Sequence, residues 1–253
     1  MPEQISCNNG MQILSFLLII AMGIAVMILS LILDYLWARV LPVRFLYYIL
    51  RFPGVVVHEC SHILGCLLTG AEVQKVVLFS EGGGSVTYAR PKIPLLGDVI
   101  ISTAPVFCIP LVLAFCTWVF SQYLGCSFPA FPIPPDSANM PGWVVTGIFR
   151  MFDANIVTRF NPWFVLYLYL TLSLILSVAP SLQDLKNAAI GITLIVVAGI
   201  LVYLSGIPPA ISILDDLTYV IGTGFSLCLV PGMIALAVSL PAIIWFICTH
   251  RHG

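Results

Sequence analysis

Charge is what this sequence has least of. Only 8% of its 253 residues are charged, whereas 60% are hydrophobic and the mean hydropathy is +1.08. Soluble domains carry about 25% charged residues, so this composition excludes a soluble fold and predicts a polytopic helical membrane protein in a lipid bilayer. The formal net charge of −1 also lacks the basic excess that nucleic-acid binding requires, and we expect no nucleic-acid partner.

The chain also lacks paired cysteines and internal repeats. None of its eight cysteines forms a Cys-x-x-Cys pair, which argues against a disulfide framework. Cys66 lies one helical turn beyond His62, but we favour packing over metal binding for this thiol. Because the loops are too short for a second fold, we predict a single integral-membrane domain over residues 1–253.

Long apolar runs are what the sequence has instead. They predict about six transmembrane helices, and we place Pro53 near the start of the second, where a proline costs no hydrogen bond. We expect residues 143–160 to lie on the membrane surface and Asp215 and Asp216 to belong to a solvated loop. The apolar runs begin at residue 11, at residue 53 and at residue 94, and continue with residues 162–179, 188–204 and 219–248.

A short stretch after the second run changes character. Two β-prone runs between residues 72 and 90 flank Gly82-Gly83-Gly84, which predicts a small β-hairpin; a flexible connecting loop fits the pattern equally well. The exposed edge of a hairpin would leave backbone groups unsatisfied in lipid, so we expect it at the interface or against the helices. Such an edge can pair with an extended peptide.

The second apolar run contains a His-Glu-x-x-His pentad at residues 58–62. On a helix, His58 and His62 lie one above the other at i and i+4, close enough to bind one zinc ion. Glu59 is offset by one residue, so its carboxylate can reach a water at the metal without being a ligand. The alternative is a pair of interfacial histidines with an ion-paired glutamate. Ionisable residues inside membrane segments usually belong to a functional site, so we favour the zinc site.

A catalytic zinc site usually has three protein ligands and one open position. Asp184, in the sequence Ser-Leu-Gln-Asp between two apolar runs, is our candidate for the third ligand. Its alternative role is that of a helix-start residue beside Lys186. Asp98 is the next candidate, although an interfacial position in a first helical turn explains it as well. His250 and His252 fit a polar chain end.

The pentad, the glycine-rich hairpin after it and an aspartate ahead of a later helix together resemble the site-2 protease family of intramembrane zinc metalloproteases. The resemblance covers roughly residues 53–204. It implies that His58, His62 and Asp184 hold one Zn²⁺ per chain and that Glu59 is the catalytic base. Many members carry an Asn-Pro…Asp-Gly motif around the third ligand. Here Ser-x-x-Asp replaces it, as in a divergent branch, and Asn161-Pro162 lies too far upstream.

The resemblance implies hydrolysis of peptide bonds in membrane-embedded proteins by a zinc-activated water, with a transmembrane protein as the substrate. Two other functions fit the pentad. One is a non-proteolytic zinc protein, either a transporter or a degenerate relative, which would not need Glu59 as a base. The other is a protease with glutamate as the third ligand, but the remaining glutamates, at positions 3, 72 and 81, do not lie in a later helix.

Six spans would place both termini on one side of the membrane. The basic residues divide evenly between the two sides, so their count does not orient the chain. We favour a hairpin on the cytoplasmic side, because the active sites of the family that the chain resembles open toward that side. We therefore expect a multi-pass protein of the cell membrane.

Overall fold

The computed structural model describes residues 2–41, 43–78, 84–92, 94–129, 140–179 and 181–250. This part of the chain is mostly helical, with one two-stranded sheet after the pentad helix, so the predicted fold class is confirmed. In chain order the elements are α1 (Pro2–Val40), α2 (Arg44–Thr69), β1 (Val73–Val77), β2 (Ser85–Tyr88), α3 (Pro94–Tyr123), α4 (Met140–Phe152), the π-helical turn η1 (Asp153–Val157), α5 (Pro162–Leu176), α6 (Leu182–Ser205) and α7 (Pro208–His250).

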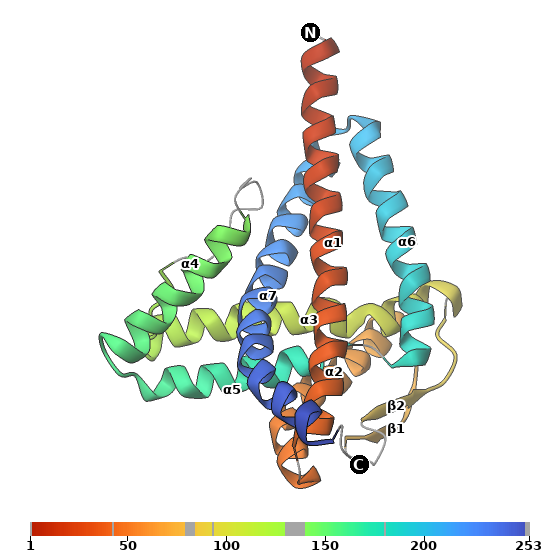
Figure 1. Cartoon of the computed structure of the whole chain (residues 1–253). Helices are drawn as coiled ribbons and strands as arrows, with labels where there is room; N and C mark the ends of the chain where they lie inside the picture. Colours follow the sequence, from red (N-terminus) through yellow and green to blue (C-terminus); the bar gives the residue numbers. More distant parts are fainter. Residues whose placement is uncertain are drawn as a thin grey trace.

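Two long helices, α1 and α7, lie side by side, and α3 and α5 cross them in the view of Figure 1. The segment expected on the membrane surface forms α4 and η1. The principal core lies where α1, α3, α5 and α7 meet, because each turns apolar side chains toward the others. Its fully buried members include Val26, Leu33, Ile109, Leu113, Phe164, Tyr167 and Ile175.

Three helical segments of the described chain are long and apolar enough to cross a membrane, namely Gly10–Arg39, Arg44–Thr69 and Leu96–Tyr123. Two shorter apolar helices, Pro162–Leu176 and Ala189–Ser205, coincide with the predicted fourth and fifth spans. The predicted sixth run lies within α7. The first apolar run belongs to α1, which ends at Val40.

The second helix starts earlier than expected, at Arg44, so Pro53 lies inside it rather than near its start. An interior proline removes one backbone donor and leaves the carbonyl four residues earlier without its helical partner. Here the Tyr169 hydroxyl of α5 donates to the Ile49 carbonyl at 2.7 Å. The Gly54 N–H donates to the Ser173 hydroxyl of α5 at 2.9 Å. Two polar side chains of α5 thus stabilise α2 around Pro53, directly before the pentad.

The predicted hairpin is present, with β1 and β2 antiparallel and an irregularity between Val73 and Lys75. Gly70 ends α2 in the left-handed conformation (φ 66°), which turns the chain into β1. A second small core of Cys66, Ala71 and Ile101 packs under Val73 and Tyr88. The hairpin therefore lies against the ends of α2 and α3; Gly82 and Gly83 fall outside the described residues.

The expectation of a solvated loop at Asp215 and Asp216 is wrong, because both residues lie in α7. Asp215 is half-buried and accepts hydrogen bonds from Tyr203 of α6 at 2.8 Å and Gln12 of α1 at 3.0 Å. These donors satisfy a carboxylate that would otherwise be costly to bury. The proline pair that suggested a turn begins the helix, where proline is well tolerated.

Candidate metal centre

The pentad occupies the second half of α2, on the face turned into the protein. His58, Glu59 and His62 are all buried, with 9%, 3% and 6% of their surfaces exposed. Their helical spacing directs both imidazoles to the same side. The ring centroids of the two histidines lie 4.9 Å apart.

The hydrogen bonds of the two histidines define their tautomers. His58 Nδ1 lies 2.6 Å from the Ser177 carbonyl oxygen, and His62 Nδ1 lies 2.8 Å from the Ile101 carbonyl oxygen. A carbonyl only accepts, so each Nδ1 carries the proton and each Nε2 of a neutral ring presents a lone pair. The two Nε2 atoms face each other at 3.2 Å. Two lone pairs cannot form a hydrogen bond, so this arrangement favours a cation between the rings.

Asp184, the predicted third ligand, lies close to both histidines. It lies in the first turn of α6, which starts earlier than expected, at Leu182. Its Oδ2 is 3.7 Å from His62 Nε2. Together with His58, these side chains offer ligand atoms that all lie within 4.8 Å of one another.

Asp184 also takes part in a helix cap. The Ser181 hydroxyl accepts from the Asp184 N–H at 3.2 Å and donates to Asp184 Oδ2 at 2.5 Å. This reciprocal pattern resembles the capping box that starts many helices. The two roles weighed from the sequence are therefore compatible, because the cap orients the carboxylate that faces the histidines.

The distances in this group fit a zinc ion. Zinc–nitrogen bonds of about 2.0–2.1 Å at tetrahedral angles place two histidine nitrogens about 3.3 Å apart. The separation of the His58 and His62 Nε2 atoms is 3.2 Å, and the Asp184 oxygen lies slightly farther out. Two imidazoles and one carboxylate leave a fourth tetrahedral position open, as catalytic zinc sites do. Backbone carbonyls at both Nδ1 atoms supply the outer partners that metal-binding histidines normally have.

Glu59 lies beside the proposed ligands and is not one of the three grouped residues. Its Oε2 atom is buried and has no hydrogen-bond partner within the described residues. The hairpin comes very close at this point, since a Cβ added to Gly84 would overlap the Glu59 carboxylate. A side chain at residue 84 would therefore displace either the Glu59 carboxylate or the hairpin backbone.

Two cavities of about 190 Å³ each meet at His58 and Glu59. One lies under the hairpin and is lined by His62, Ser85, Val86, Tyr88 and Asp184 in addition. Burial and the carboxylate of Asp98 raise the pKa of Tyr88 to about 12. The hydroxyl of Tyr88 therefore stays protonated and donates a hydrogen bond to Asp98 at 3.4 Å.

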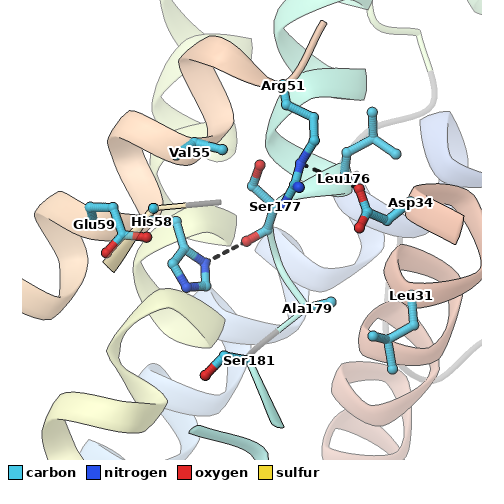
Figure 2. Close-up of a pocket in the computed structure, with 11 residues that line it drawn as sticks. Leu31, Asp34, Arg51, Val55, His58, Glu59, Leu176, Ser177, Ala179 and Ser181 are labelled. Atoms are coloured by element: carbon cyan, nitrogen blue, oxygen red, sulfur yellow. Dashed lines mark hydrogen bonds and ion pairs between the residues drawn. The ribbon is translucent and has the colours of Figure 1, made fainter. Parts of the chain in front are cut away.

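The other cavity lies between α2, α1 and the segment after α5 (Figure 2). The Arg51 guanidinium points toward Asp34 of α1, at an Nε–Oδ1 distance of 3.3 Å. The Tyr47 hydroxyl also donates to Asp34, at 2.5 Å. The sequence pattern did not single out Arg51 as a residue of this cavity. Its position seven residues before His58, on the same helical face, was the available signal.

Several sequence candidates lie away from the centre. Asp98 sits in the second turn of α3, accepts from the Tyr88 hydroxyl at 3.4 Å and is not in the ligand group. Cys66 is fully buried in the small core, as the packing interpretation expected. Asn161 caps α5 by accepting from the Trp163 N–H at 3.0 Å. His252 and the side chain of His250 lie outside the described residues.

Fold and site together define a helical membrane protein with a buried His-His-Asp group beside a glutamate. A family model described as Peptidase M50B-like matches residues 21–125, which include the pentad and the hairpin. This match covers less than half of the chain and supports the resemblance to the site-2 protease family. No curated protein and no solved structure matches the chain.

Proposed function

We propose that the protein is an intramembrane zinc metalloprotease that cleaves membrane-embedded proteins. One observation carries the proposal: the Nε2 atoms of His58 and His62 face each other at 3.2 Å with the Asp184 carboxylate alongside. His58, His62 and Asp184 would hold one Zn²⁺. The family match independently favours peptidase chemistry for the part of the chain that carries both histidines.

Zinc bound at these residues would lower the pKa of a water molecule toward about 7 and polarise the scissile carbonyl. With zinc bound, Glu59 would serve as the general base for that water, because its Oε2 has no hydrogen-bond partner within the described residues. The same carboxyl group later donates the proton to the leaving amine. Its burial excludes competing hydrogen bonds from bulk water.

The substrate has to be extended at the cleaved bond, since a helical peptide hides its carbonyl in the i to i+4 ladder. Three residues of β2, Ser85, Val86 and Tyr88, line the cavity at the proposed ligands. We therefore expect the unwound substrate to pair with the free edge of β2 through main-chain hydrogen bonds. A transmembrane protein is the corresponding substrate class, and a multi-pass position in the cell membrane the corresponding location.

The glutamine variant of Glu59 tests this function. Glu59→Gln keeps the shape and burial of the side chain but removes the base, so cleavage of a transmembrane substrate in liposomes should fall at least about 100-fold. Zinc content, measured by mass spectrometry of the purified protein, should remain one ion per chain. Glu72→Gln, at an exposed position before the hairpin, is the matched control and should cleave normally.

A non-proteolytic zinc protein would give a different result. Glu59→Gln would then leave every measured property unchanged, and wild-type protein would bind zinc without cleaving any substrate. Loss of zinc in His62→Ala would still occur in that case. Full zinc occupancy in His62→Ala would instead contradict the metal centre itself.

A further inference from the structure

A groove on the outer surface lies between the end of α2 and the start of α3. It has a volume of about 410 Å³ and is separate from the cavities at the proposed zinc ligands. Its walls are mainly apolar and one residue at its edge is a cation. The lining residues are Leu67, Leu68, Thr69, Gly70, Lys92, Leu96, Gly97 and Ile100.

The apolar walls belong to two helices of membrane-spanning length. Leu67 and Leu68 are 70% and 73% exposed, and Leu96 and Ile100 are 50% and 40% exposed. Leucine and isoleucine side chains this exposed on such helices face lipid hydrocarbon rather than water. The groove therefore has the shape and chemistry to receive an acyl chain.

The polar end of the groove is the exposed residue Lys92, four residues before the membrane segment that starts at Leu96. The side chain lies over the end of α2, where a Cβ on Gly70 would be 3.0 Å from Lys92 Cδ and Cε. A lysine that snorkels packs its apolar stem against the protein and holds its amine at the depth of the lipid headgroups. Among the residues that the structure describes, no carboxylate forms an ion pair with Lys92.

Two further cations lie in the segment between α2 and α3 that also carries Lys92. Lys75 on β1 and Arg90 after β2 are also exposed. Of the nearby described carboxylates, Glu72 is exposed at the hairpin base and Asp98 accepts from Tyr88. Within the described residues neither acid forms an ion pair with Lys92, which leaves its amine available to a phosphate.

We propose that this groove binds an anionic phospholipid, with an acyl chain along Leu67, Leu68 and Ile100 and the headgroup phosphate on Lys92. A negative headgroup complements the unpaired amine, and the chain covers apolar surface that two membrane helices leave open. A zwitterionic lipid fills the same groove but carries a compensating cation that weakens the attraction. This site is independent of the proposed proteolysis and of zinc.

Native mass spectrometry of the full chain, titrated with phosphatidylglycerol and phosphatidylcholine of identical acyl chains, tests the proposal. One lysine–phosphate contact near a membrane surface corresponds to about a fivefold preference for the anionic lipid. Lys92→Met retains the apolar stem over Gly70 and should remove this preference, whereas Lys92→Arg should keep it. Lys186→Met, at an exposed cation on α6, is the control and should also keep it.

An equal affinity of the wild-type chain for both lipids, or a preference that survives in Lys92→Met, would overturn the site. An equal loss in Lys186→Met would assign the effect to overall surface charge and overturn it too. Leu67→Gln should weaken the binding of both lipids while the preference for the anionic lipid stays. Leu201→Gln on α6, where the side chain is 61% exposed, should change neither the affinity nor the preference. Glycerol 3-phosphate should not compete. Competition by this soluble headgroup would show a phosphate site without acyl recognition.

Discussion

At the scale of single residues, the proposed metal centre depends on the hydrogen bond that the Nδ1 atom of each histidine makes. The carbonyls of Ser177 and Ile101 hold the Nδ1 protons, so His58 and His62 present lone pairs to one point. The pentad spacing predicted that both rings share a face. It carried no information about their carbonyl partners, since any residue supplies a carbonyl and only the packing of α3 and of the segment after α5 places these two.

Asp184 combines two roles that variants can separate. Asp184→Asn keeps a side chain able to accept a hydrogen bond but removes the charge. We expect zinc affinity to fall at least as much as the roughly 10- to 100-fold typical for loss of an outer partner. Ser181→Ala removes the cap and should cost about 1 kcal/mol of stability while the carboxylate remains. Competition with a fluorescent zinc chelator and thermal unfolding measure the two effects.

The two variants have opposite expected patterns, which makes each a control for the other. Wild-type zinc affinity in Asp184→Asn would contradict the ligand role and leave only the cap. The Ser-x-x-Asp spacing contained both possibilities, and the sequence favoured the ligand role because a carboxylate between two apolar helices is costly unless it is paired or bound to a metal. The early start of α6, which places residue 184 in its first turn, is what the sequence pattern did not predict.

At the scale of elements, the hairpin and α2 meet at a single glycine. The Gly84 backbone lies against the Glu59 carboxylate with no room for a methyl group. The glycine-rich pattern predicted a turn, whereas the structure shows that residue 84 is needed for this close approach. The prediction that Pro53 lies near a helix start was wrong for a related reason. The hydroxyls of Tyr169 and Ser173, which stabilise α2 around this proline, come from a helix more than 100 residues later.

Gly84→Ala should displace either the hairpin or Glu59. A shift of about 1 Å in a catalytic group can cost about 100-fold in rate, so we expect a loss of cleavage of that order. Zinc content should stay at one ion per chain, because the three atoms nearest to the added methyl group all belong to Glu59, which is not a proposed ligand. Gly10→Ala is the matched control, since nothing lies within 4 Å of a Cβ there. Normal cleavage by Gly84→Ala would show that this contact is not needed.

At the scale of the whole molecule, the proposed ligands connect parts of the chain that otherwise pack little on each other. The His58–His62 helix packs mainly on α3 and α5, while α6, which carries Asp184, packs mainly on α3 and α1. Hydropathy predicted the helical membrane class and most helix positions, because burial in lipid dominates such segments. The neighbours of each helix depend on side-chain packing that hydropathy does not encode. The single domain over residues 1–253 stays a prediction.

Zinc should therefore tighten α6 against α2 more than it changes any other pair of helices. Hydrogen exchange of the purified protein, with zinc and after chelation, measures this effect for each segment. With zinc, we expect slower exchange in residues 182–187 and in the second half of α2, because opening the first turn of α6 would then require breaking a metal bond. In His62→Ala, zinc should leave both segments unchanged. The contact of α1 with α7 lies away from the proposed ligands and should exchange equally in all samples. Slower exchange throughout the chain would indicate general stabilisation, and slower exchange in α2 alone would mean that the two histidines bind zinc without Asp184.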